Sequence, residues 1–140
     1  MLLVDTNLAS GMGLQSATAP RTLDLYRDVL ERQPLAIALQ TMAEALAGAE
    51  LKNWGERRRA GQRAALDHFV LLLPDVATAE AWAQLTAHAQ QRGRALSAGD
   101  AWIGATAVRH GLVLVTHDAD FDGLDFPGLD VVCRIGASGG

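Results

Sequence analysis

The chain has a single cysteine, Cys133, so no disulfide bond can form within it. This scarcity of cysteine fits a protein of a reducing compartment. No apolar run is long enough to cross a bilayer. The N-terminus also lacks a basic segment followed by a cleavable apolar stretch. We therefore expect a cytoplasmic protein with no membrane association.

Clusters of histidine and cysteine are absent too, because the four histidines are scattered without the spacing of zinc ligands. Of the 140 residues, 49% are apolar and 20% are charged, which is ordinary for one soluble globular domain. The net charge of −4 argues mildly against a simple nucleic-acid binder. Two bound divalent cations would cancel that charge, so a metal-dependent nuclease is not excluded.

Short apolar runs alternate with segments of helical periodicity along the chain. This alternation predicts an α/β domain, with a parallel sheet and helices on both faces. We expect one domain over residues 1–135 and a mobile Gly- and Ser-rich tail over 136–140. The expected strands are 2–5, 35–39, 70–73, 112–115 and 129–133, and the expected helices are 20–32, 41–54, 55–69, 78–92 and 99–110.

Four carboxylates occupy similar local settings in this pattern. Asp5 and Asp118 follow apolar strands, whereas Glu44 and Asp100 lie just inside expected helices. In open α/β sheets, ligands bind beyond the carboxyl ends of the strands. We therefore expect the four side chains to converge on one site at that edge of the sheet.

Crowded carboxylates repel one another and take up protons unless a cation lies between them. Oxygen-only ligands of this kind suit Mg²⁺ or Mn²⁺. Such an ion polarises a phosphate oxygen and lowers the pKa of bound water, and two ions about 3.5–4 Å apart can stabilise both oxygens of an in-line displacement. The pattern therefore favours a metal-dependent nuclease.

Each carboxylate also has a purely structural interpretation. Two of them lie three residues after a hydroxyl residue, which is the spacing of a capping box. The other two suit a turn and a helix N-cap. These alternatives are capping by Thr41 with Glu44 and by Ser97 with Asp100, a turn at Asp5, and an N-cap at Asp118 for a short helix through Phe121.

Four stretches of sequence together resemble a known family. They are LVDTN at 3–7, TMAEALAGA at 41–49, DAWIGATA at 100–107 and LVTHDADF at 114–121. In this order and at these separations, the chain resembles PIN-domain proteins over essentially its whole length. The resemblance is strongest to the VapC-type toxins of bacterial toxin–antitoxin pairs.

This resemblance implies a single PIN-like domain, in which helices sandwich a five-stranded parallel sheet. It implies a Mg²⁺- or Mn²⁺-dependent endoribonuclease that cleaves RNA with metal-activated water. It also implies a homodimer that is silenced by a VapB-like antitoxin. It assigns catalytic and metal-binding roles to Asp5, Glu44, Asp100 and Asp118, substrate contacts to Asn7, Thr116 and His117, and a further acidic candidate to Asp120.

The chain departs from the family pattern in three places. Gln40 stands where a small or hydroxyl residue is common, and His117 stands where a basic residue such as arginine is frequent. The loop Gly11–Ala19 is rich in glycine and serine rather than basic. None of these departures removes a carboxylate, but they leave the choice of RNA substrate open.

The most basic stretch spans residues 52–63, with Trp54 among the cations. A helix of this kind could follow phosphates while an aromatic ring stacks on a base. The alternative is a solvated helix face, with Trp54 in the core or at a dimer contact. Similar alternatives hold for His117, as a phosphate contact or an exposed loop residue, and for Trp102, as a base platform or a core residue.

Two other functional classes stay open. A PIN fold without catalysis would act as a binding module, but crowded carboxylates are costly without a cation. A receiver-like phosphoryl-transfer domain would suit Asp5 at a strand end. Such a domain needs a mid-chain aspartate on the third strand and a lysine after the last, and no lysine follows Lys52.

Overall fold

The computed structural model describes residues 1–14 and 20–136. Most of the expected mobile tail, and residues 15–19 of the Gly- and Ser-rich loop, lie outside the described residues. The strands are β1 (Leu2–Val4), β2 (Leu35–Ala38), β3 (Val70–Leu72), β4 (Val113–Val115) and β5 (Val131–Val132), and the helical segments are α1 (Thr6–Ala9), the π-helical turn η1 (Ser10–Leu14), α2 (Pro20–Asp24), α3 (Arg27–Leu30), α4 (Leu39–Leu51), α5 (Glu56–Leu66), α6 (Val76–Gln91) and α7 (Ala98–His110).

The five strands form one parallel sheet, as predicted, and the structure gives their order as β3-β2-β1-β4-β5. The central strand β1 pairs with β2 on one side and with β4 on the other. The chain therefore leaves β1 in one direction and later returns to its opposite side. A reversal of this kind opens a crevice at the carboxyl ends of β1 and β4, where α/β proteins bind ligands.

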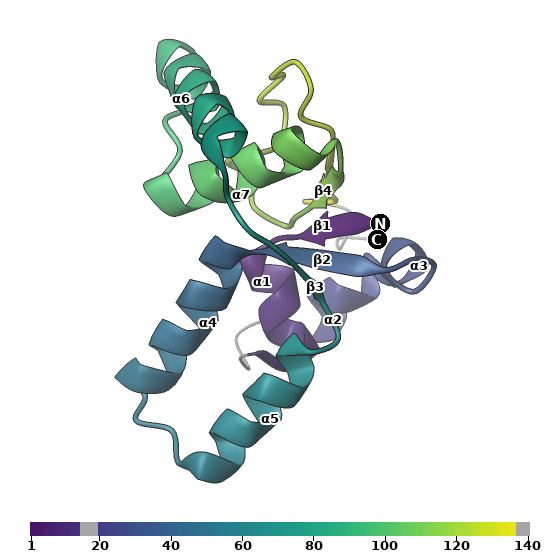
Figure 1. Ribbon diagram of the computed structural model, residues 1–140. Coiled ribbons are helices and arrows are strands. Elements are labelled where there is room, and N and C mark those ends of the chain that lie inside the picture. The colour runs from purple at the N-terminus through teal and green to yellow at the C-terminus, as the bar shows by residue number, and fades with distance from the viewer. Residues whose placement is uncertain (15–19, 137–140) are drawn as a thin grey trace.

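Alternating side chains of the strands face two separate cores. In β1, Leu2 and Val4 pack in one core, whereas Leu3 packs in the other. The first core lies against α1, α3 and α4, and the second lies against α7. Figure 1 shows the same layers, with α6 and α7 above the sheet and α1, α4 and α5 below it. Helices therefore flank both faces, which explains why the strands are almost wholly apolar.

Helix α6 packs on the outer side of α7 and contributes to a third, smaller apolar cluster. Leu85 of α6 is completely buried and packs with Leu124 from the segment after β4. Gly104 of α7 allows this close approach, because a Cβ atom there would lie 2.7 Å from Cδ2 of Leu85 and 3.3 Å from a ring carbon of Phe121. The two helices and the loop after β4 therefore pack as one unit.

The predicted helix over residues 20–32 is wrong, because the structure has two short helices with a break at Tyr26. The Tyr26 side chain is completely buried. Its hydroxyl accepts a hydrogen bond from the Arg134 backbone N–H at 2.8 Å and pairs with Nδ1 of His117 at 2.7 Å. These long-range contacts fix Tyr26 in a non-helical backbone conformation, and helical periodicity alone does not reveal them.

Several other predicted boundaries differ from the structure. Helix α4 begins at Leu39 rather than Thr41, and α5 ends at Leu66 rather than Phe69. The last strand is confined to Val131–Val132.

Within the ranges 1–14 and 20–136, we find no helix with the length and apolarity that crossing a membrane requires.

The packing at Gly104 predicts opposite effects for two glycine-to-alanine changes. Gly104→Ala should lower the free energy of unfolding by about 1–3 kcal/mol, because the added methyl group overpacks a buried contact. Gly61→Ala, on the exposed helix α5, meets nothing within 4 Å and should raise stability by about 0.5–1 kcal/mol. Urea unfolding of both variants measures the difference, and equal effects would contradict this account of the α6–α7 packing.

Candidate metal centre

Asp5 lies at the base of the crevice, directly after β1, and is only 3% exposed. Its Oδ1 accepts a hydrogen bond from the Thr6 N–H at 2.7 Å and thereby caps helix α1. Its Oδ2 accepts a hydrogen bond from the Thr116 hydroxyl at 2.5 Å. The carboxylate is therefore held in one orientation by both neighbouring elements.

Thr116 connects β1 with the loop that follows β4. While its hydroxyl donates to Asp5, the same oxygen accepts a hydrogen bond from the Asp118 N–H at 3.1 Å. Thr116 is completely buried and its bond to Asp5 lies away from solvent, whereas its bond with the Asp118 N–H is partly buried. One side chain thus fixes the position of Asp118 relative to Asp5.

The loop after β4 carries Asp118 and Asp120, but it does not form the short helix that was considered as an alternative. Instead, the Asp118 carboxylate accepts a hydrogen bond from the Asp120 N–H at 2.9 Å, as in an Asx turn. The Arg94 guanidinium donates to the carbonyls of Ala119, Asp120 and Asp122 at 3.0, 3.4 and 2.5 Å. Arg94 therefore anchors this loop through its main chain.

Asp100 approaches the loop from the first turn of α7. Ser97 caps this helix, since its hydroxyl accepts a hydrogen bond from the Asp100 N–H at 3.1 Å. The Asp100 side chain itself points to the acidic loop, where one oxygen each of Asp100, Asp118 and Asp120 lie within 4.8 Å of one another. Ser97 therefore caps the helix as that alternative expected, but the described contacts include no return bond from the Asp100 carboxylate to Ser97, so the capping box is incomplete and this carboxylate is available to the site.

Glu44 reaches the site from α4. The capping box proposed for it is wrong, because α4 begins at Leu39 and Ala38 is the N-cap residue, with no side-chain cap. Thr41 lies inside the helix, where its hydroxyl is 3.0 Å from the Thr6 hydroxyl. Glu44 therefore does not form a capping box with Thr41, and its Oε1 accepts a hydrogen bond from Gln40 Nε2 at 3.0 Å.

Gly99 allows Glu44 and Asp100 to come together. A Cβ atom at Gly99 would lie 2.9 Å from Oε1 of Glu44 and 3.0 Å from Nε2 of Gln40. A side chain at this position would therefore displace the ends of the Glu44 and Gln40 side chains from their present positions. Sequence reasoning did not identify Gly99 or the supporting role of Gln40, although Gly99 directly precedes an expected ligand.

The predicted carboxylates lie close enough together for their charges to raise the pKa values of Asp5 and Asp100. Burial is the main cause that raises the pKa of Asp5, while the hydrogen bonds from Thr116 and Thr6 oppose it and the charges of Asp118 and Glu44 add to it. The pKa of Asp100 rises to about 6, chiefly through burial and then through repulsion from Asp5, Asp118 and Glu44. The structure therefore brings the quartet Asp5, Glu44, Asp100 and Asp118 into one charged cluster.

Two of the predicted substrate contacts lie beside this cluster in different environments. Asn7 is exposed on α1, two residues after Asp5. His117 is half-buried, and its ring meets Tyr26 edge-on at 5.7 Å between centroids. The interpretation of His117 as an exposed loop residue is therefore wrong, because Tyr26 holds the ring at Nδ1.

The donor set fits a hard divalent cation. The four carboxylates and the Thr116 hydroxyl beside them offer oxygen atoms, which Mg²⁺ and Mn²⁺ prefer. A cation between the carboxylates would also remove the repulsion that raises the pKa of Asp100. The residues present therefore suit the metal that the sequence pattern predicted.

Comparison with known proteins places this geometry in context. The family described as PIN domain matches residues 2–127. The chain is 30% identical to the VapC ribonuclease Y4jK of Sinorhizobium fredii over 139 residues, which cover 94% of this chain and 96% of that protein. It is similar to a toxin–antitoxin complex from Klebsiella pneumoniae (32% identity, TM-score 0.66, 94% and 96% of the chains covered) and to FitAcB from Neisseria gonorrhoeae (26% identity, TM-score 0.73, 94% and 96% covered).

The raised pKa of Asp100 predicts how pH affects the stability of the metal-free protein. Since the pKa is about 6 in the folded state against an ordinary 3.8, the folded protein binds this proton more tightly, and stability falls as pH rises through that window. Asp100→Asn should therefore raise the melting temperature in EDTA at neutral pH. Its advantage over the wild type should shrink as pH is lowered, and an advantage that stays the same at every pH would contradict the prediction.

Proposed function

Since the chain belongs to the PIN-domain family and is a VapC-type ribonuclease toxin of a VapBC toxin–antitoxin system, we propose that its acidic cluster is the catalytic centre of a metal-dependent endoribonuclease. The observation that carries the proposal is the convergence of four carboxylates from distant parts of the chain, with the pKa of Asp100 raised to about 6. Such crowding is costly in the absence of a cation. A binding module without catalysis would not explain why these carboxylates are held close together.

In this proposal, Asp5 and Asp100 are the firmest ligands of Mg²⁺ or Mn²⁺, and Glu44 and Asp118 complete the site directly or through water. The bound ion supplies Lewis-acid polarisation of the scissile phosphate and a lowered pKa for water. Asp120 extends the acidic rim, which supports a role as an additional ligand.

The remaining side chains orient the ligands and the substrate. Thr116 holds Asp5 and the Asp118 backbone in fixed positions, so little rearrangement is needed when the ion binds. Asn7, exposed beside Asp5, is proposed to contact the scissile phosphate. Because Tyr26 occupies Nδ1 of His117, the other ring nitrogen, Nε2, is left to meet a phosphate or leaving oxygen.

Cleavage of total RNA by the purified protein tests this proposal. Asp100→Asn should reduce the rate by on the order of 100-fold or more, since a divalent ion contributes several kcal/mol and each tenfold costs about 1.4 kcal/mol. EDTA should abolish cleavage, and Mg²⁺ or Mn²⁺ should restore it. Mapping the product ends then identifies the RNA and the cleaved bond.

Glu80→Gln is the matched control, because it removes an exposed carboxylate on α6 outside the cluster. It should cleave as the wild type does. Equal products from wild type and Asp100→Asn would reveal a contaminating ribonuclease. The absence of cleavage in either metal, once mass spectrometry excludes a copurifying inhibitor, would favour the binding module.

We further propose that the chain pairs with a VapB-like antitoxin. FitAcB and the Klebsiella toxin–antitoxin complex, to which the chain is similar over 94% of its length, support such a partner. The protein also offers an apolar pocket of about 170 Å³ lined by Met12, Leu23 and Leu30. Leu46 on α4 is 43% exposed, which is consistent with an apolar partner segment.

Self-association is proposed at the edge strand β3. Leu73 and Val76, which follow this strand, are 61% and 77% exposed. Beside them, Leu39, Pro74 and Trp102 line a pocket of about 190 Å³. An edge strand with exposed apolar side chains is usually covered by a partner, and a second copy of the chain would bury it.

Light scattering of single variants tests the dimer. Leu73→Lys or Val76→Lys should raise the dimer dissociation constant at least about tenfold, because burial of such a side chain contributes about 1.5–3 kcal/mol. Leu51→Lys is the control, since Leu51 is 87% exposed at the far end of α4. A monomeric wild type, or three variants with equal dimer strength, would contradict this surface.

A further inference from the structure

Most basic side chains of this protein are occupied by other groups of the same chain. Six arginines pair with carboxylates within 4.0 Å, and Arg94 binds the carbonyls of the acidic loop. Over residues 1–14 and 20–136, five cations have no such partner. They are Arg21, Arg32, Lys52, Arg57 and Arg58, and the last three share the hairpin of α4 and α5.

At the tip of this hairpin, two cations meet one aromatic ring. Nζ of Lys52 lies 5.8 Å from the centroid of the Trp54 ring, and the Arg58 guanidinium carbon lies 5.7 Å from it. The nearby acids do not neutralise these cations, because Glu50 pairs with Arg59 and Glu56 pairs with Arg63. The tip therefore combines unpaired positive charge with an indole surface.

The hairpin tip is held in a defined shape. The Arg59 side chain donates hydrogen bonds to the Trp54 carbonyl and to the Glu50 carboxylate, both at 2.7 Å. The backbone N–H of Trp54 donates to the Ala49 carbonyl at 3.0 Å. Asn53 completes the turn with a positive φ of 52°. The ring and its two cations are therefore presented by an ordered turn.

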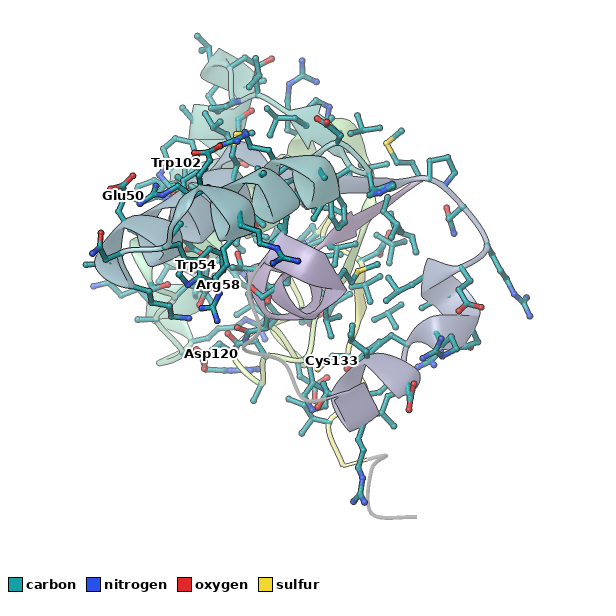
Figure 2. The ribbon with its side chains drawn as sticks, turned by 90° about the horizontal axis from the view of Figure 1, so that it is seen from below. Glu50, Trp54, Arg58, Trp102, Asp120 and Cys133 are labelled. Carbon is teal, nitrogen blue, oxygen red and sulfur yellow. The ribbon has the colours of Figure 1, made fainter. Side chains whose placement is uncertain are left out.

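The tip faces the same side of the protein as the acidic cluster. Figure 2, which shows the molecule from below, has Trp54 and Arg58 pointing to the side of the picture on which Asp120 lies. Lys52 is eight residues beyond Glu44 in the sequence, which corresponds to about 12 Å at 1.5 Å per helical residue. Three or four stacked nucleotides span roughly that distance at 3.4 Å each.

We propose that the tip of the α4–α5 hairpin is a binding site for single-stranded RNA, in which Trp54 stacks on a base and Lys52 and Arg58 hold the adjoining phosphates. This inference rests on the proposed ribonuclease function and adds a substrate site outside the metal centre. Single-stranded nucleic acid binds to aromatic rings set among cations, and such sites tolerate many sequences. The protein carries a net charge of −4, and its acidic cluster repels RNA. An unpaired basic tip would attract the RNA strand in spite of this repulsion.

Trp54 differs from the other two tryptophans in the surroundings of its ring. Trp82 and Trp102 lie against each other at 5.6 Å between centroids, so each covers part of the other's ring. Trp54 has no aromatic neighbour among the described residues and is only partly buried. Lys52 and Arg58 lie against its ring, and their side chains can move to phosphates while a base takes their place on the ring.

Binding of a fluorescently labelled single-stranded RNA to the full chain tests this site, in an Asp100→Asn background that prevents cleavage. Trp54→Leu should weaken affinity about tenfold, whereas Trp54→Phe, which keeps a stacking ring, should retain most of it. Lys52→Gln and Arg58→Gln should each reduce the slope of log affinity against log salt by about 0.7. Arg32→Gln, which removes an exposed cation elsewhere, should change neither quantity.

In otherwise wild-type protein, the same tip variants should raise KM for RNA cleavage and leave kcat and the Mg²⁺ dependence unchanged. Wild-type affinity and KM in Trp54→Leu would overturn the hairpin site while leaving the ribonuclease function intact. Loss of antitoxin binding with unchanged RNA affinity would make the tip a protein contact. If the wild type neither binds nor cleaves RNA, the proposed function and the hairpin site both fail.

Discussion

The hydrogen bond between Thr116 and Asp5 holds the rest of the site in place. It joins the ends of the two central strands, β1 and β4, at the point where the chain changes direction across the sheet. Asp5 is almost fully buried, so its charge needs this bond and the bond from the Thr6 N–H. The same hydroxyl oxygen accepts a hydrogen bond from the Asp118 N–H. Loss of this one hydroxyl would therefore displace the carboxylates of Asp5 and Asp118 together.

The sheet, its parallel strands and the placement of Asp5 and Asp118 could be predicted because they follow from local pattern. Apolar runs identify buried strands, and parallel connectivity brings their ends to one edge. The environment of Glu44 could not be predicted in the same way. Its apparent capping motif depends on where α4 begins, and the chain enters that helix two residues earlier, directly from β2.

The break at Tyr26 and the closeness of Glu44 to Asp100 were hidden for a related reason. Tyr26 leaves the helical pattern because its hydroxyl meets Arg134 and His117, which lie more than 90 residues away in the sequence. The positions of the Glu44 and Gln40 side-chain ends beside α7 depend on the missing side chain of Gly99. Contacts at such sequence separations leave no periodic signal, so only the folded structure reveals them.

Arg94 holds the acidic loop by its carbonyl oxygens, and this choice of partner has an evolutionary consequence. Carbonyl groups are common to all residues, so substitutions among the exposed residues 119, 120 and 122 leave the anchor intact. Relatives could therefore vary the chemistry of this rim by single substitutions while Asp118 stays in position. The loop can diversify in sequence without a compensating change in the scaffold.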